Sequence, residues 1–165
     1  MVDKLLFLVD VQNLFYACRD SFGIDTRVDF KKLKELALNA REVRFVNAIA
    51  YLTYLKDDFA NVLKVLNRFG YETKIRPIQQ HGDELSDTDS DMDIAADVLK
   101  YADGCQVVVV ASGDADFIPL YRVLREKGIR VEVLAFDRTL SRQVINHVDA
   151  ITLLNENVLF KREIA

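Results

Sequence analysis

Cysteine and histidine are scarce in this sequence, and their scarcity removes several classes of site. Only two of the 165 residues are Cys and two are His. Cys18 and Cys105 have neither the spacing of metal ligands nor that of a disulfide framework, and their apolar surroundings predict buried thiols. His81 and His147 stand alone, without the Ser or Cys partner that nucleophilic catalysis requires.

Long hydrophobic runs and an excess of basic charge are missing as well. The longest apolar runs are far too short to cross a membrane, and no signal peptide is recognisable, so we expect a cytoplasmic protein without a membrane partner. The formal net charge of −4 argues against a surface that binds nucleic acid over its whole area. It is compatible with an enzyme that holds phosphates through metal ions and a few local cations.

The sequence instead contains strands and helices in regular alternation. Its length, with 50% hydrophobic and 29% charged residues, predicts one globular domain over residues 1–165. Apolar periodicity predicts strands at 4–10, 43–52, 71–75, 107–111, 130–135 and 151–154. It predicts helices at 11–22, 30–40, 59–69, 92–102, 117–127 and 140–148.

This alternation predicts the fold class. Strand–helix–strand units imply parallel pairing, and hence an α/β protein, a three-layer α/β/α sandwich with a central, mostly parallel, Rossmann-like sheet. Residues 78–91 are expected to form an irregular acidic loop, solvated and able to move over the edge of the sheet. The tail, residues 155–165, is expected to lie on the surface or to pack as a short helix.

The stretch from Val107 to Phe117 is the most informative part of the chain. Four valines and Ala111 predict a strand buried on both faces, and Ser112 and Gly113 end it. Asp114 and Asp116 follow where the next helix begins. A single aspartate would suffice to cap that helix. Two aspartates at the carboxyl end of a buried parallel strand favour a ligand site, because ligands bind at that edge.

Other acidic residues are predicted to reach the same edge. Asp10 ends the first strand, and Asp93 lies in the first turn of the helix that leads back to the central strand. If the two strands are neighbours where the strand order reverses, Asp10, Asp93, Asp114 and Asp116 converge. Asp97, one helical turn after Asp93, lies just behind them or is an ordinary helix carboxylate.

Clustered carboxylates need a counter-ion. They repel one another, and a set of oxygen ligands without His or Cys suits a hard cation such as Mg²⁺ or Mn²⁺. The acidic run 87–91 begins like a calcium-binding loop, but Met92 stands at its glycine position and Val98 at its closing glutamate, so an EF-hand is rejected.

Three sequence blocks carry a family resemblance: residues 8–13 (LVDVQN), 90–97 (SDMDIAAD) and 112–117 (SGDADF). They resemble the NYN domain family of the LabA type, a branch of the PIN-like nucleases, in composition and in order. Ser141 also falls where family members often carry a serine. The stretch 86–92 departs from the family, because many members have a lysine there and this chain has none.

The resemblance implies a PIN-like fold and a metal-dependent endoribonuclease. It makes Asp10, Asp93, Asp114 and Asp116 the metal-site acids and adds Asn13, which would position substrate or a metal-bound water. Arg138 and Arg142 follow a strand end and are candidate phosphate contacts. The predicted substrate-binding set is Asn13, Ser112, Arg138, Ser141 and Arg142.

Two other functions compete with the nuclease. A non-catalytic RNA-binding or regulatory module that keeps the acidic site would fit the missing lysine and the acidic surface. A phosphotransferase of the dehalogenase type needs a second aspartate two residues after Asp10, where this chain has Gln12. RNA is the expected partner, and a monomer and a homodimer are both compatible with the sequence.

Overall fold

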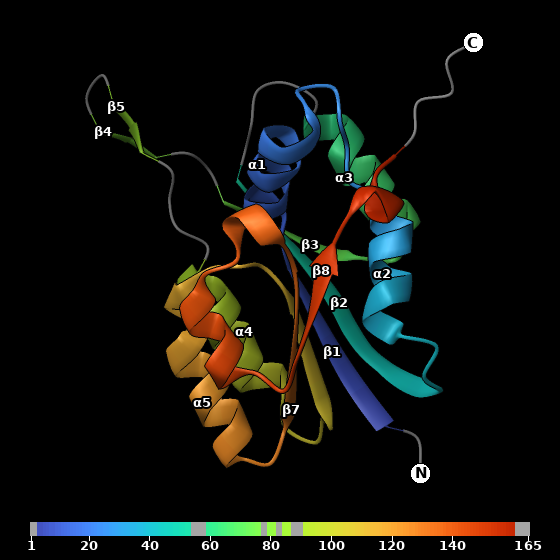
Figure 1. Ribbon diagram of the computed structural model, residues 1–165, viewed down its shortest axis with the longest axis vertical. Coiled ribbons are helices and arrows are strands. Elements are labelled where there is room, and N and C mark those ends of the chain that lie inside the picture. Colours follow the sequence, from blue (N-terminus) through green and yellow to red (C-terminus); the bar gives the residue numbers. More distant parts are fainter. Residues whose placement is uncertain (1–2, 54–58, 77–78, 82–83, 87–90, 161–165) are drawn as a thin grey trace.

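Six parallel strands form the centre of the computed structural model, which describes residues 3–53, 59–76, 79–81, 84–86 and 91–160 (Figure 1). The strand order is β3-β2-β1-β6-β7-β8, and every neighbouring pair is parallel. The predicted parallel α/β fold is thereby confirmed. The strands are β1 (Asp3–Asp10), β2 (Val43–Thr53), β3 (Glu72–Arg76), β6 (Val107–Ala111), β7 (Arg130–Phe136) and β8 (Ala150–Leu154).

The two central strands, β1 and β6, are neighbours. They pair from Leu5 opposite Val107 to Val9 opposite Ala111, and the side chains of both stretches are buried. The strand order reverses between them, since β2 and β3 lie on one side and β7 and β8 on the other. The predicted reversal point is therefore confirmed, and it is the place where open α/β sheets bind ligands.

Helices cover both faces of the sheet (Figure 1). Alternate residues of β1 point to opposite faces, so Leu5, Phe7 and Val9 enter one core and Leu6 and Leu8 the other. The first core is closed by α1 (Val11–Phe22), α2 (Phe30–Leu38) and α3 (Phe59–Arg68), and the second by α4 (Asp91–Tyr101) and α5 (Ile118–Glu126).

Aspartates begin the first two helices. The Asp10 side chain accepts a hydrogen bond from the Asn13 amide, and the Asp29 side chain accepts from the amides of Lys31 and Lys32. These bonds satisfy amide groups that the helix itself leaves unpaired. The aspartate that ends β1 thus also fixes the start of α1, which lies at the carboxyl edge of the sheet.

Two predicted segments differ from the structure. The helix expected at 140–148 is wrong: the 3₁₀ segment η3 (Arg142–His147) takes its place, and another 3₁₀ segment, η2 (Asp137–Thr139), precedes it. Val144 is the only buried residue of η3, too few to support an α-helix through packing. Residues 78–91 are also not wholly irregular, because β4 (Gln79–His81) and β5 (Glu84–Ser86) form an antiparallel pair, which extends away from the sheet (Figure 1).

The end of the described chain packs against the body of the protein. The 3₁₀ segment η4 (Glu156–Val158) places Val158 and Leu159 in the first core. The Asp29 amide donates to the Val158 carbonyl at 2.7 Å, and Val28 forms an isolated bridge with Leu159. Two arrangements are expected for the tail, and residues 156–158 adopt the second, a short helix that packs on the protein.

Both cysteines are buried free thiols, as the sequence predicts. Burial raises the pKa of Cys18 and of Cys105, so both sulfur atoms are held in the unreactive thiol form. Within the described ranges, the structure contains no helix with the length and apolarity needed to cross a membrane.

An ion pair joins Arg41, in the turn after α2, to the sheet. Both terminal nitrogens of Arg41 donate to the carboxylate of Glu132 on β7, each at 2.9 Å. Burial alone would raise the pKa of Glu132, but the hydrogen bonds and charges of Arg41 and Arg130 outweigh it and hold that pKa below its ordinary value.

We therefore predict that Glu132→Gln lowers the free energy of unfolding at pH 7 by about 1 to 2 kcal/mol. A depressed pKa stabilises the fold above the unfolded-state value, about 4.3, and the contribution disappears as the pH falls through the folded-state pKa. Urea unfolding of both proteins at pH 7 and pH 3.5 measures this. A difference of the same size at both pH values would contradict the assignment.

Candidate metal centre

Burial and side-chain hydrogen bonds define the turn after β6. Ser112 is completely buried, and its hydroxyl accepts a hydrogen bond from the Asp114 amide at 3.3 Å. Asp114 caps the 3₁₀ segment η1 (Ala115–Phe117) by accepting from the Asp116 amide at 2.9 Å. The side chain of Ser112 therefore shapes the turn that carries the acidic residues.

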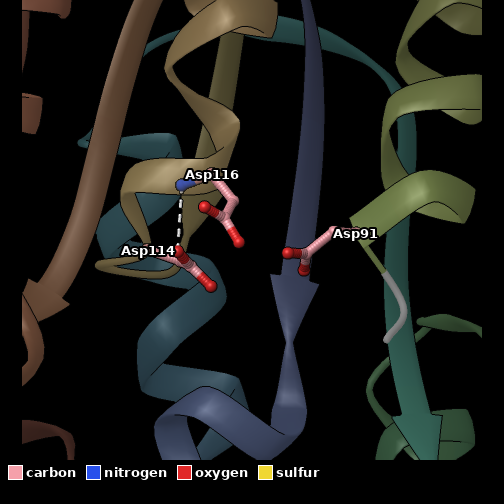
Figure 2. Close-up of side chains that lie close together, drawn as sticks. All are labelled: Asp91, Asp114 and Asp116. Carbon is pink, nitrogen blue, oxygen red and sulfur yellow. Dashed lines mark hydrogen bonds between the residues drawn. The ribbon is translucent and has the colours of Figure 1, made fainter. Parts of the chain in front are cut away.

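Three carboxylates meet at this turn. One carboxylate oxygen from each of Asp91, Asp114 and Asp116 lies within 4.8 Å of the others. Figure 2 shows them turned toward a common space, Asp91 from the start of α4 and the other two from the turn after β6. We call these three residues the acid cluster. An all-oxygen donor set of this kind suits a hard divalent cation.

Asp10 and Asn13 lie beside the acid cluster. The Asn13 side-chain oxygen accepts a hydrogen bond from the Gly113 amide at 3.3 Å, which ties the first turn of α1 to the turn after β6. Asp10 is 7% exposed, and its charge acts on the Tyr121 hydroxyl together with the charges of Asp91 and Asp114. The predicted convergence of the ends of β1 and β6 is thus present in the structure.

Asp93 and Asp97, by contrast, face cations of β3. Arg76 donates from Nε to the carboxylate of Asp93, and this hydrogen bond, with the charges of Arg76 and Lys74, lowers the pKa of Asp93. Lys74 donates to both oxygens of Asp97 at 2.7 Å, and the Tyr51 hydroxyl donates to Asp97 at 2.6 Å. Asp97 therefore lies in a structural network on the side of α4 that faces β3.

Helical geometry explains why Asp91 and not Asp93 joins the acid cluster. Each residue of an α-helix is rotated by about 100° from the one before it, so residues two apart point to nearly opposite sides, whereas residues four apart share a face. Asp93 and Asp97 therefore turn together toward β3, and Asp91 turns toward β6. From the sequence, this helix is expected to start at Met92, which assigns Asp91 to the acidic run 87–91 and not to α4.

Lys74 is charged within this network. Burial alone would lower the pKa of Lys74, but the hydrogen bond and the charge of Asp97 outweigh it and raise that pKa. The buried Tyr51 hydroxyl stays protonated, because burial and then Asp97 raise its pKa. Sequence reasoning gave no role to Lys74, Arg76 or Tyr51, since their partners are distant in the chain.

The segment after β7 lies against the turn that carries the acids. The Ser141 amide donates to the Gly113 carbonyl at 2.9 Å. Arg138 and Arg142 are exposed, and Arg138 donates to the carbonyl of Asp20 at 2.9 Å. The backbone at Ser141 thus lies against this turn, whereas the Arg138 side chain reaches toward the last turns of α1. The expected movement of the loop 78–91 over this edge depends on residues 78, 82–83 and 87–90, which lie outside the described residues.

A separate apolar cavity of about 470 Å³ lies on the other side of α1, toward α2 and α3. Phe15, Leu52 and Phe69 are among its lining residues. None of the three members of the acid cluster lines it. The acid cluster, which lies outside this cavity, is therefore the candidate metal centre.

Comparisons with known proteins extend over nearly the whole chain. The family model of the NYN domain matches residues 4–155. The chain is 26% identical over 161 residues to "Low amplitude and bright protein LabA" of Synechococcus elongatus, covering 93% of this chain and 84% of that protein. The crystal structure of a protein of unknown function from Vibrio parahaemolyticus is similar with a TM-score of 0.85 and 27% identity, covering 96% of this chain and 97% of that one.

Gly113 allows the close approach between the two segments. A Cβ atom at this position would lie 2.7 Å from the carbonyl carbon of Thr139 and 2.8 Å from the Cα of Leu140, both backbone atoms. We predict that Gly113→Ala lowers the free energy of unfolding by about 2 kcal/mol or more, because the backbone must shift. Gly104→Ala is the control: its Cβ would meet nothing nearer than 3.9 Å, and its positive φ costs about 1 kcal/mol.

Urea unfolding of the two variants measures the difference. Equal losses for Gly113→Ala and Gly104→Ala would show that the turn can move away from η2 without cost.

Proposed function

We propose that this chain, which belongs to the NYN domain family, is a metal-dependent endoribonuclease. One observation carries the proposal: the acid cluster gathers three carboxylates from two parts of the chain, at the sheet edge where α/β folds bind ligands. Such a gathering of like charges is costly unless a cation offsets it. The donor set fits Mg²⁺ or Mn²⁺.

The cation would be held by Asp91, Asp114 and Asp116, with Asp10 adding negative charge beside them. Because Arg76 engages the carboxylate of Asp93, we assign to Asp91 the place that the family resemblance gives to Asp93. When bound, the cation supplies an activated water as nucleophile and offsets charge on the scissile phosphate.

The chain's own residues position the substrate. Asp116 is the exposed member of the acid cluster and lies on the side that RNA can approach. Asn13 fixes the turn by accepting from the Gly113 amide, so it positions the acids. Arg138 and Arg142, exposed beside the turn, supply phosphate contacts that place the RNA backbone over the cluster.

A second candidate function is an RNA-binding module that keeps the acid cluster and does not cleave. The ion pairs of β3 favour it, because Lys74 and Arg76 are engaged by Asp97 and Asp93. No lysine is present in residues 86–92 either, where many relatives have one. This module would bind RNA with Mn²⁺ and leave it intact.

Cleavage of labelled single-stranded RNA tests the first function. We expect the wild-type protein to cleave with Mn²⁺ and to stop with EDTA, and Asp114→Asn to lower the rate by at least about 100-fold. Asparagine also caps helices and removes one repelling charge, so the melting temperature without metal holds or rises. Metal-dependent binding without cleavage would favour the second function, and unfolding of the variant would make Asp114 a structural residue.

Thermal melting with Mn²⁺ tests which acids bind the cation. The ligands gather only in the folded state, so a hundredfold excess over the dissociation constant adds about 2.7 kcal/mol of stability. We expect millimolar Mn²⁺ to raise the melting temperature more than Mg²⁺ does, because Mn²⁺ keeps its waters less tightly. Asp91→Asn should remove most of this shift and Asp10→Asn should reduce it, whereas Asp93→Asn should keep it.

The reverse result for Asp91 and Asp93 would move Asp93 into the site and Asp91 out of it. Equal shifts in all these variants would show that the ion binds elsewhere. Lowering the pH into the carboxylate range should erase the shift in the wild-type protein, because protonated carboxylates do not bind the ion.

A further inference from the structure

Tyr121 carries the one buried side-chain polar atom without a hydrogen-bond partner in the described part of the chain. The residue is completely buried on α5, and its ring packs near that of Phe117, with 6.4 Å between the centroids. Native proteins pair nearly all buried polar atoms, and an exception calls for an explanation. A phenylalanine would fill the same apolar space without this cost.

Within the described ranges, the other two buried tyrosines show the usual arrangement. The Tyr51 hydroxyl donates to Asp97 at 2.6 Å, and the Tyr71 hydroxyl donates to the carbonyl of Phe30 at 2.7 Å. Each has a fixed acceptor within the protein. Tyr121 differs from both, because its buried hydroxyl has no hydrogen-bond partner among the described residues.

Tyr121 lies in the first turn of α5, which begins at Ile118 directly after η1, the segment that carries Asp116. The nearby acids act on its hydroxyl: burial and then the charges of Asp114, Asp91 and Asp10 raise the pKa of Tyr121. The phenol therefore keeps its proton and can donate it in a hydrogen bond.

In the present arrangement, one oxygen from each acid lies within 4.8 Å of the others, and none of them accepts a hydrogen bond from the Tyr121 hydroxyl. A hydrogen bond from Tyr121 therefore requires a shift of one carboxylate. A carboxylate that coordinates through one oxygen is commonly held by a hydrogen bond from a neighbouring residue.

We propose that Tyr121 is a positioning residue of the cation site, whose hydroxyl donates a hydrogen bond to a carboxylate of the acid cluster in the cation-bound arrangement. This inference rests on the cation site of the proposed function. The unpaired hydroxyl of Tyr121 thereby gains a hydrogen bond that forms only when the cation is bound. Tyr121 acts through the ligands and contacts neither the cation nor the substrate.

The test is Tyr121→Phe, measured with Mn²⁺ as the probe. Melting in EDTA reports the stability of the cation-free protein, and electron paramagnetic resonance of free Mn²⁺ gives the dissociation constant. We expect the variant to melt at the same temperature as the wild-type protein or higher in EDTA, because an unpaired hydroxyl is lost. We expect its dissociation constant for Mn²⁺ to rise by about 10- to 100-fold.

Tyr71→Phe is the matched control. It removes a buried hydroxyl that has an acceptor, and its ring lies in the core on the opposite face of the sheet. We expect this variant to melt at a lower temperature in EDTA and to keep the wild-type dissociation constant for Mn²⁺. Tyr121→Phe should therefore weaken Mn²⁺ binding without lowering the melting temperature, whereas Tyr71→Phe should lower the melting temperature without weakening Mn²⁺ binding.

The outcomes separate this inference from the proposed function. Wild-type affinity for Mn²⁺ in Tyr121→Phe would overturn the role of Tyr121 and leave the cation site standing. A fall in melting temperature in EDTA as large as that of Tyr71→Phe would show that the hydroxyl has a structural partner, and would also overturn it. Absence of Mn²⁺ binding in the wild-type protein would overturn the cation site, and the inference with it.

Discussion

The pairing of β1 with β6 determines where the acidic residues lie. The two strands share five buried pairs, and the last joins Val9 to Ala111. The next residues are Asp10 and Ser112, so both strands become polar at the same level. A shift of register would draw Asp10 or the turn with Asp114 between apolar strands, where an unpaired carboxylate is costly. The length of the apolar stretch thus fixes the register and the position of the site together.

Helix α4 divides its acids between two environments. Asp93 and Asp97 face the cations of β3, an edge strand, and are neutralised by Arg76 and Lys74. Asp91 faces the opposite way and meets Asp114 and Asp116. Like charges repel, and the free energy of that repulsion is recovered when a divalent cation binds between them. The same helix therefore forms ion pairs through one face and carries an acid of the proposed cation site on the other.

The sequence was sufficient to predict the sheet and the edge of the sheet at which the acid cluster lies. Continuous apolar runs predicted β1 and β6. Asp10 at the end of β1 and Asp114 just after β6 predicted an acidic carboxyl edge. Three features required coordinates. Only the packing of α4 shows that Asp91 turns toward Asp114 and Asp116 while Asp93 turns toward Arg76 on β3. The 3₁₀ segments after β7 flank Ser141, whose amide donates to the carbonyl of Gly113, a residue distant in the chain. Tyr121, four residues after Phe117, has the spacing of an ordinary core residue, and only its unpaired hydroxyl distinguishes it.

Asp10 and Asp114 each combine a structural task with a charge. Asp10 caps α1, and Asp114 caps η1. Capping uses a side-chain oxygen as an acceptor, which asparagine offers as well, whereas a cation requires the negative charge. A carboxylate has two oxygens, so accepting from an amide and binding a cation are compatible. Substitution by asparagine therefore separates the two tasks, and substitution by alanine would remove both at once. The fold needs the oxygen atom at these positions, and the proposed chemistry needs the charge.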